Sequence, residues 1–281
     1  MLFNATEAEE EAQADEDLKN KLALELLLTP KIRLILDDVA TDSEAIYART
    51  GYIITGESWQ KRVETTLRSH YDVVQDAFGM QASEVMGADK EGGAIYALIA
   101  AYAARRSMTR REALAELDRI NAGMLNEWAI ENARKRAGWI TATTTNELDV
   151  AYSDATLLMP QDASRDAVAR EGASAFRRAN APRAEIISAT ETQAAAEAAK
   201  RIDLDAAAIF AAAQIKAKKT WRTRGDDRVR PAHAAANGQT LGVDDPFIVM
   251  GQRLQYPGDS SLGATAANVC NCRCSAIYSL S

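Results

Sequence analysis

Apolar residues recur at helical spacing through most of the first 215 residues of the chain. The first apolar stripe consists of Leu18, Leu22, Leu26 and Leu27. We expect the helix that carries this stripe to end at Thr29-Pro30, because a proline inside a helix removes a backbone hydrogen bond and crowds the preceding turn.

A second apolar stripe predicts a longer helix that begins at Ser58. Its members follow one another at three or four residues' distance: Trp59, Val63, Leu67, Tyr71, Val74 and Phe78. His70 lies beside this stripe, and we expect a single histidine there to be a packed or surface residue, not a ligand.

The helical pattern continues in several later segments. Residues 92–106 are apolar on most faces, which predicts a buried helix. The sequence TRRE at residues 109–112 is a capping box that opens another helix. That helix directs four apolar residues inward: Leu114, Leu117, Ile120 and Met124. Residues 141–146 (TATTTN) are expected to form a break or a linker, and helices resume over residues 164–178 and from Pro182 towards Lys200.

The helical spacing of apolar residues ends near Lys216. Charged and uncharged residues alternate loosely over residues 216–223, which indicates a strand that enters a small α+β module. Turns between short elements are expected at Gly238, Gly242, Gly251, Gly258 and Gly263. We therefore predict an α+β protein with a predominantly α-helical N-terminal body and a small C-terminal α+β module.

The expected divisions of the chain are an acidic tail over residues 1–17, a helical body over residues 18–215 and the C-terminal module over residues 216–281. The boundary between body and module is expected near residues 200–216.

Composition excludes some classes of protein. The formal net charge of −7 argues against nonspecific binding of nucleic acid by the protein as a whole. No apolar run approaches the roughly 18–20 residues that span a membrane, and no signal peptide is expected because acids follow an uncharged N-terminus. The three cysteines all lie between Cys270 and Cys274, so they form no disulfide framework and fit a reducing compartment.

Charge is distributed unevenly along the chain. Residues 7–17 carry seven acids and no base, which indicates a solvated tail or a frayed helix start. A docking segment for a basic partner is the alternative interpretation. A basic run near the module's start provides candidate contacts to DNA phosphates: Lys216, Lys218, Lys219, Arg222 and Arg224. The interpretation we favour is a solvated surface whose arginines pair with carboxylates, since the net charge of the chain is negative.

The pattern Asp226-x-Arg228-x-Arg230-x-x-His233 gathers charged groups at short spacings. A carboxylate beside guanidinium groups is most simply a structural clamp, in which Asp226 pairs with Arg230 or caps the turn's amides. No serine, cysteine or second carboxylate stands at a recognisable nucleophile spacing, and the chain has no phosphate-binding glycine loop of the Walker type. We therefore expect no enzymatic activity.

The densest group of metal-ligating residues is Cys270-Asn271-Cys272-Arg273-Cys274. A tetrahedral zinc ion requires four nitrogen or sulfur ligands. The candidate ligands are His233, Cys272 and Cys274, with Cys270 or Asp226 as the fourth. Because the chain lacks the two Cys-x-x-Cys pairs usual for zinc, the alternative is that the thiols are small packing residues in a tight turn.

The order of these elements resembles the Mu F-like head morphogenesis family, the minor head proteins of tailed bacteriophages. The matching elements are Trp221, Asp226, Arg228, Arg230, His233, Gly238, Phe247, Pro257-Gly258-Asp259 and Asn271-Cys272-Arg273-Cys274. Upstream, Arg183-Ala184 and Thr190-Glu191-Thr192 resemble the family's helix, although Ala189 stands where an arginine is frequent. Cys270 stands where relatives usually carry an aliphatic residue, which favours packing for that thiol. The resemblance covers roughly residues 180–278.

The resemblance implies a structural role in the virion. Relatives lie inside the capsid near the portal vertex and take part in procapsid assembly and in genome packaging or ejection. The implied partners are the portal protein, the scaffold and major capsid proteins, and packaged double-stranded DNA. No membrane partner is expected. The implied locations are the capsid interior and, during assembly, the host cytoplasm.

The resemblance also implies that the polar residues of the module form a structural clamp. The one candidate cofactor is the structural zinc ion considered above. The clamp residues are Trp221, Asp226, Arg228, Arg230, His233, Asp259 and Asn271. Two other functions stay open: a metal-dependent hydrolase or toxin-associated module, which would need an additional catalytic domain, and a DNA-binding adaptor that uses residues 216–230.

Overall fold

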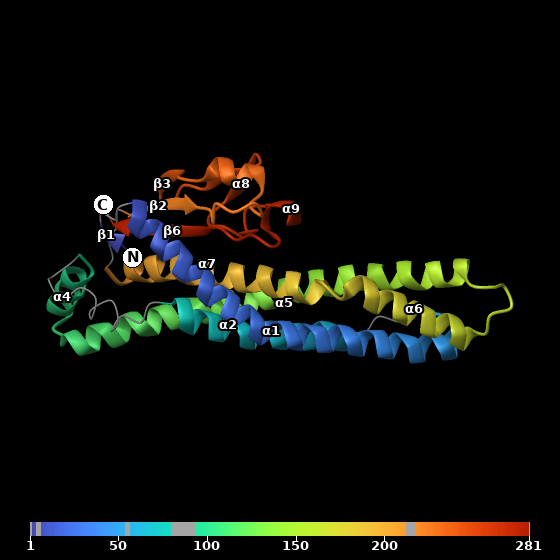
Figure 1. Cartoon of the computed structure of the whole chain (residues 1–281). Helices are drawn as coiled ribbons and strands as arrows, with labels where there is room; N and C mark the ends of the chain where they lie inside the picture. The colour runs from blue at the N-terminus through green and yellow to red at the C-terminus, as the bar shows by residue number, and fades with distance from the viewer. Residues whose placement is uncertain (1, 4–6, 54–56, 80–93, 212–216, 281) are drawn as a thin grey trace. The chain divides into compact units, whose positions relative to one another are not determined.

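Helices make up most of the chain, and the strands lie near its two ends (Figure 1). The computed structural model describes residues 2–3, 7–53, 57–79, 94–211 and 217–280. The helices are α1 (Glu7–Thr50), α2 (Glu57–Phe78), α4 (Ala94–Arg106), α5 (Arg110–Leu158), α6 (Arg165–Asn180), α7 (Arg183–Ala211), α8 (Pro231–Ala236) and α9 (Ala266–Val269). The strands are β1 (Leu2–Phe3), β2 (Ala217–Arg222), β3 (Thr240–Gly242), β4 (Phe247–Val249), β5 (Gln252–Leu254) and β6 (Ser275–Leu280). The predicted α+β class is confirmed.

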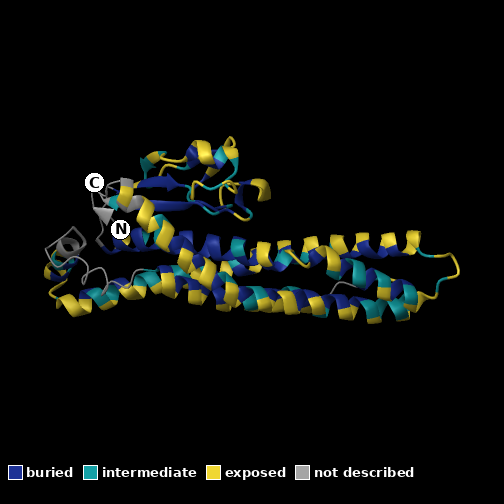
Figure 2. Ribbon diagram, viewed as in Figure 1, coloured by how far each residue is buried: buried dark blue, intermediate teal, exposed yellow. Residues whose placement is uncertain are grey.

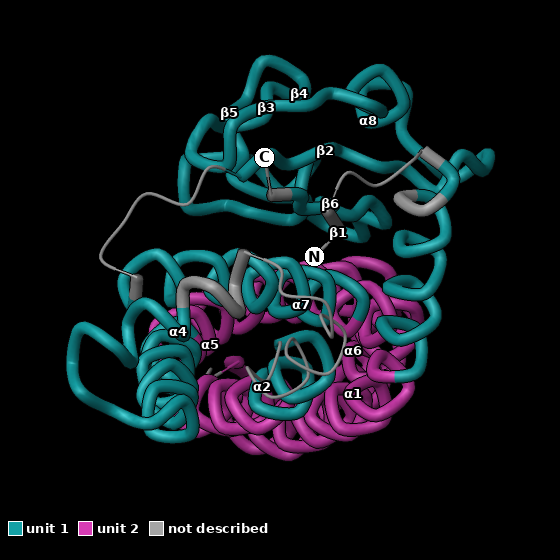
Figure 3. Tube along the Cα trace, turned by 90° about the vertical axis from the view of Figure 1, so that its left-hand side faces the viewer, with its two compact units in different colours: residues 1–23, 71–128, 189–281 teal, residues 24–70, 129–188 magenta. Residues whose placement is uncertain are grey.

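The chain divides into two compact units, and each combines segments that are far apart in the sequence (Figure 3). Unit 1 comprises residues 1–23, 71–128 and 189–281, and unit 2 comprises residues 24–70 and 129–188. The expected linear division at residue 216 stays a prediction.

Unit 2 is a bundle of helical segments from α1, α2, α5, α6 and the start of α7. The expected end of the first helix at Thr29-Pro30 is wrong, because Pro30 lies inside α1. The stripe that α1 buries is also different from the expected one: Leu28, Ile32, Leu36 and Val39 are at most 6% exposed. Burial of this stripe on both sides of Pro30 offsets the lost hydrogen bond. By contrast, Leu26 is 75% exposed.

The expected break at residues 141–146 is also wrong, because these residues lie within α5. The hydroxyl groups of three threonines donate hydrogen bonds to backbone carbonyl groups of the same helix. Thr143 donates to the carbonyl of Trp139 at 2.9 Å, Thr144 to that of Ile140 at 2.6 Å and Thr145 to that of Thr141 at 3.0 Å. Side-chain bonds to carbonyls three or four residues back let such residues remain helical.

Other expectations about the helices are confirmed. All six apolar residues of the stripe on α2 are buried. His70 beside them is buried too, and burial, together with the nearby charge of Lys31, lowers its pKa to about 4. Thr109 and Glu112 form the capping box: Glu112 Oε2 accepts the backbone N–H of Thr109 at 2.7 Å, and Thr109 Oγ1 accepts that of Glu112 at 3.2 Å.

The helix expected over residues 92–106 is observed as α4, from Ala94 onward, and residues 92–93 lie outside the described residues. Within residues 99–106, Ile99 and Ala103 are buried, whereas Ala101 and Ala104 are exposed. The expectation of burial on most faces is therefore wrong for this part of the helix.

Unit 1 contains a four-stranded sheet in the order β1-β6-β2-β3 and a separate hairpin of β4 and β5. The strand expected over residues 216–223 is β2, which pairs antiparallel with both β6 and β3. Lys219, Thr220, Trp221 and Arg222 are all buried, so both faces of β2 are covered (Figure 2). β1 pairs with β6 in parallel, which places residues 2–3 in the sheet instead of in a solvated tail.

The acidic segment over residues 7–17 forms the first turns of α1, and its last residue joins a buried network of charges in unit 1. Lys200 Nζ lies 2.7 Å from Asp17 and 2.8 Å from Glu197, and Lys21 Nζ lies 2.6 Å from Glu197. Glu197 also accepts the backbone N–H of Ala276 in β6 at 2.9 Å. Of the two forms expected for this segment, the helix start is observed.

Within the described residues, no helix is both long enough and apolar enough to cross a membrane.

Candidate metal centre

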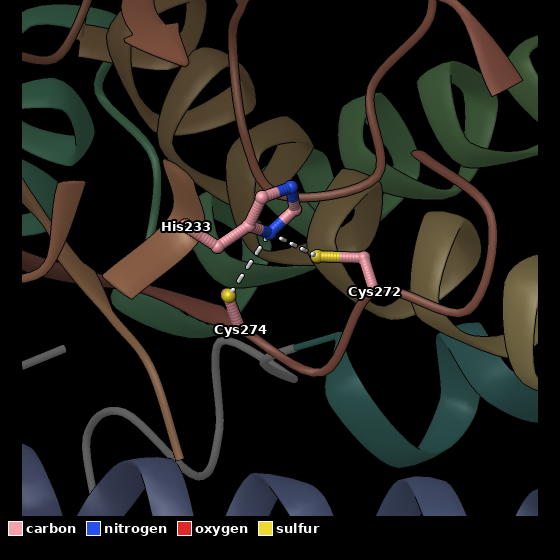
Figure 4. A group of neighbouring side chains, drawn as sticks. All are labelled: His233, Cys272 and Cys274. Carbon is pink, nitrogen blue, oxygen red and sulfur yellow. Dashed lines mark hydrogen bonds between the residues drawn. The ribbon is translucent and has the colours of Figure 1, made fainter. Parts of the chain in front are cut away.

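Three metal-ligating side chains of unit 1 meet in one buried cluster (Figure 4). His233 lies in the short helix α8, and Cys272 and Cys274 lie in the segment just before β6. The Nδ1 atom of His233 is 3.6 Å from the Sγ atom of Cys272 and 3.5 Å from that of Cys274. Because side chains alternate along an extended segment, the spacing of two residues directs both sulfurs to the same side.

The cluster is shielded from solvent: the exposed fractions are 2% for His233, 4% for Cys272 and 1% for Cys274. A hydrogen bond from Cys274 lowers the pKa of the Cys272 thiol well below its usual value. The same bond, together with burial, raises the pKa of the Cys274 thiol. The two pKa values therefore shift in opposite directions because the thiols bond to each other beside the imidazole ring. A cation bound by both sulfurs would require both thiols to lose their protons.

Only three of the expected ligands come together. Among the described residues, the group consists of His233, Cys272 and Cys274, without Cys270 or Asp226. The half-buried Cys270 is linked through its carbonyl oxygen to Arg230. Asp226 pairs with Arg273 and Arg224 instead. A tetrahedral ion would thus take its fourth ligand from outside this set.

Aromatic rings line the cluster on one side. The Trp221 ring meets the His233 ring edge-on at 5.5 Å between centroids, and it meets the Phe247 ring at 5.2 Å. Both Trp221 and Phe247 are 0% exposed. This apolar wall keeps water from the sulfurs, which strengthens electrostatic interactions at the cluster.

The Nε2 atom of His233 faces two polar side chains. It lies 2.8 Å from Oδ1 of Asn268 and 3.2 Å from Nη1 of Arg230. Arg230 also donates to the backbone carbonyl groups of Asn268, at 3.0 Å, and Cys270. Arg230 therefore joins the start of α8 to the carbonyl end of α9, where a positive charge is favourable.

The pairing of Asp226 with Arg230 that the sequence suggested is wrong. Asp226 lies 2.8 Å from Nη2 of Arg273 and 3.3 Å from Nε of Arg224, and it accepts the backbone N–H of Arg228 at 3.2 Å. The arginine whose charge it balances next to the cysteines is therefore Arg273. The Arg228 side chain is exposed.

The other two clamp residues stabilise turns elsewhere in the module. Asp259 is buried and accepts the N–H groups of Gln255 at 2.8 Å and Ser261 at 2.7 Å. Asn271 has a φ of 52° and donates its backbone N–H to Thr190 Oγ1 at 3.0 Å. The seven clamp residues thus form several contacts and not one interlocked group. Their shared role as a clamp stays a prediction.

One face of α7 holds the segment that carries the cysteines. Gln193 donates to the carbonyl oxygens of Pro257 at 3.1 Å and Cys274 at 2.8 Å. Gly258, with a φ of +87°, lies so close that a Cβ atom there would be 3.1 Å from Gln193 Cγ. Thr190, Gln193 and Glu197 are spaced three and four residues apart, so they share one face of the helix.

The residues expected to contact DNA lie in different environments. Lys216 lies outside the described residues. Lys219 is 0% exposed, and its Nζ donates to the backbone carbonyl and the side-chain oxygen of Gln255 at 2.8 and 2.9 Å. Arg222 is 8% exposed. Burial in the covered strand β2 removes Lys219 and Arg222 from the candidates, whereas Lys218 and Arg224 are exposed.

Acids of α1 face some of the same arginines. A cavity of about 270 Å³ in unit 1 is lined by Glu11 and Asp15 together with Arg222, Arg224 and Arg273. This arrangement agrees with the interpretation that the arginines lie near carboxylates of the same protein. It also means that the acids would compete with phosphate groups there.

Several residues that hold the cysteine segment in place were not predicted from the sequence. Asn268, Gln193 and Glu197 carry no recognisable motif. Their contacts with Gln252, Cys274 and Ala276, respectively, join residues 16, 81 and 79 positions apart in the chain. The signal that could have pointed to Glu197 is an acid on the apolar, alanine-rich face of a predicted helix.

Comparison with known protein families gives a match. Residues 159–277 match the model of a protein family described as Phage Mu protein F like protein. The match begins directly after α5 ends at Leu158 and includes α6, α7 and most of the module, with His233, Cys272 and Cys274. No curated protein and no solved structure shows a significant match to the chain. Residues 159–277 of the chain are therefore similar to the Mu F-like phage proteins.

Proposed function

We propose that this protein is a minor head protein of a tailed bacteriophage. It lies inside the capsid near the portal vertex, binds the portal protein and assists procapsid assembly and genome packaging or ejection. Scaffold and major capsid proteins are its further partners during assembly in the host cytoplasm. The observation that carries this proposal is the family match over residues 159–277.

The contacts of the module support a structural role over an enzymatic one. Asp259 accepts backbone N–H groups, Arg230 donates to backbone carbonyl groups and Gln193 donates to two more. These polar groups are used to hold loops, and the thiols and the imidazole are buried. A hydrolase would need its nucleophile or metal to face a substrate.

Portal binding can be tested by co-expressing the full chain with the portal protein of the same phage. We expect the two to co-elute as a complex with portal oligomers in size-exclusion chromatography. The matched control replaces the phage protein with a helical protein of the same size and charge. Separate elution of the two proteins at micromolar concentrations would contradict the proposed partnership.

We also propose that the cluster of His233, Cys272 and Cys274 holds a structural zinc ion. Two thiolates and an imidazole are the ligand types that zinc prefers over calcium or magnesium. The ion would join helix α8 to the segment that leads into β6. The backbone hydrogen bonds of the sheet pair β6 with β2 and do not include α8. The role of the ion would be structural: it would cross-link two segments of the module.

For DNA, we propose that contact with the packaged genome involves the exposed residues Lys218 and Arg224. Replacing both by alanine should reduce the slope of log affinity against log salt concentration by about two, since each phosphate contact contributes roughly 0.9. Arg111→Ala, a charge removal at an exposed site in α5, is the control. An unchanged slope in the double variant would exclude this contact.

A further inference from the structure

We infer that Asn268 is a positioning residue for the metal: it holds His233 in the tautomer that presents the lone pair of Nδ1 to the two sulfurs. This inference rests on the proposal that the cluster binds zinc. It assigns a role to a residue that is neither a ligand nor part of a recognisable motif.

The orientation of the Asn268 amide follows from two neighbouring oxygen atoms, one of the backbone and one of a side chain. Its Nδ2 lies 2.9 Å from the carbonyl oxygen of Val249, which can only accept. Nδ2 also lies 3.3 Å from Oε1 of Gln252. That Gln252 atom must be the oxygen, because it accepts the backbone N–H of Thr265 at 3.0 Å. Both neighbours of this side of Asn268 are therefore acceptors, and the amide nitrogen has to face them.

The opposite side of the amide then determines the tautomer of His233. With its nitrogen turned to the hairpin of β4 and β5, Asn268 presents Oδ1 to Nε2 of His233 at 2.8 Å. An amide oxygen only accepts, so Nε2 carries the proton. In a neutral imidazole the other nitrogen is then an acceptor. That nitrogen, Nδ1, lies 3.5 and 3.6 Å from the two sulfurs (Figure 4).

Arg230 does not compete for this role. Its Nη1 atom lies 3.2 Å from Nε2, but it carries only hydrogens to donate and it donates to the backbone carbonyl of Asn268 at 3.0 Å. The proton acceptor for Nε2–H is thus Asn268, which is 0% exposed and hence shielded from exchange with water. A partner that fixes the ring and its tautomer is typical of metal-binding histidines.

The binding experiment uses Co²⁺ as the probe with the full-length reduced protein. Thiolate-to-cobalt absorption bands report the Cys ligands, and competition with a chelator gives the affinity. We expect wild type to bind about one equivalent and Asn268→Leu, which removes the acceptor at similar volume, to bind about 10–100-fold more weakly. Asn268→Asp keeps an acceptor for Nε2–H and should recover most of the affinity. Cys272→Ser is the reference for loss of a ligand.

A second readout needs neither metal nor variant. ¹⁵N NMR of metal-free wild type, labelled at histidine, distinguishes a protonated Nε2 from a protonated Nδ1. We expect His233 to be protonated at Nε2, and we expect a mixture of tautomers in Asn268→Leu if that variant folds.

The outcomes separate the two proposals. Failure of wild type to bind Co²⁺ or zinc would overturn the zinc proposal and, with it, the role of Asn268. Wild-type binding with equal affinity in Asn268→Leu would overturn the positioning role alone. An Nδ1-protonated His233 in metal-free wild type would overturn it as well, even if Asn268→Leu does not fold.

Discussion

At the scale of single residues, cysteines two positions apart have different surroundings. Cys272 is buried against His233, whereas Cys270 is half-buried and lies outside the cluster. The pair therefore offers a built-in control for the zinc proposal. A change of sulfur to oxygen at each position alters the side chain in the same way, but only one position contributes a ligand.

The first prediction concerns this pair. Cys272→Ser should reduce bound zinc from about one equivalent per chain to a small fraction and destabilise the module, because a structural site contributes its binding energy to folding. Cys270→Ser should retain both the metal and the melting temperature. Elemental analysis of protein purified without added metal checks the first, and calorimetry checks the second. Equal zinc in both variants, or none in wild type, would contradict the site.

Lys219 gives a prediction for pH. Burial lowers its pKa to about 8 from the usual 10.5, with a further contribution from the charge of Arg201. Since the unfolded chain binds this proton more tightly, the folded state should gain stability as pH rises from about 8 to about 10.5. Below that window the buried charge costs stability.

The variants Lys219→Met and Lys218→Met test this directly. The difference in unfolding free energy between wild type and Lys219→Met should change in favour of wild type between pH 8 and pH 10.5. The exposed neighbour Lys218 should show no such change on substitution. Urea unfolding at several pH values measures both. A difference for Lys219→Met that is independent of pH would show that this lysine does not titrate in the window.

At the scale of elements, helix α7 holds the C-terminal module through hydrogen bonds of its polar side chains. Thr190, Gln193 and Glu197 contact the backbone of Asn271, Cys274 and Ala276, respectively. Glu197 also balances the charges of two lysines inside unit 1. The attachment of the cysteine segment therefore depends on a polar face of this helix and not on apolar packing alone.

Glu197→Gln should be strongly destabilising, because it leaves two buried ammonium groups with less compensation. Breaking such a buried pair costs about 3–5 kcal/mol. The matched control is Glu185→Gln in the same helix, since Glu185 pairs with Arg33 at a site where both side chains are about half exposed. That substitution should cost at most about 1 kcal/mol. Chemical denaturation compares the two, and similar small losses would argue against the buried network.

Elements with a long apolar stripe were predictable, and elements decided by tertiary contacts were not. The stripe on α2 and the capping box of α5 depend on neighbours within a few residues, so local spacing reveals them. Pro30 and the threonines at 143–145 are local helix-breaking or β-forming signals that packing and back-bonding override. β1 forms only because β6, at the other end of the chain, pairs with it.

The candidate site shows the same division. His233, Cys272 and Cys274 were predictable because their chemistry identifies them wherever they lie in the fold. Asn268 was not, since its meaning depends on contacts with Val249 and His233, 19 and 35 residues away. The pairing of Asp226 failed for a related reason: nearness in sequence to Arg230 did not determine which arginine its carboxylate meets.

At the scale of the whole molecule, each compact unit is built from segments that are far apart in the sequence. Residues 1–23 belong with residues 189–281 in unit 1, so the acidic N-terminal segment is part of the unit that contains His233, Cys272 and Cys274. The family match over residues 159–277 includes segments of both units. The similarity to Mu F-like proteins therefore includes part of the helical body as well as the C-terminal module.

The measurement that tests the proposed role most directly is the protein composition of purified heads. Quantitative mass spectrometry of the phage's procapsids and DNA-filled heads should detect this chain in a fixed ratio to the portal protein. The signal should persist after surface proteins are removed by protease, because a protein inside the capsid is protected. Absence of the chain from both kinds of particle, or its complete loss to protease while the portal is retained, would contradict the role of an internal head protein.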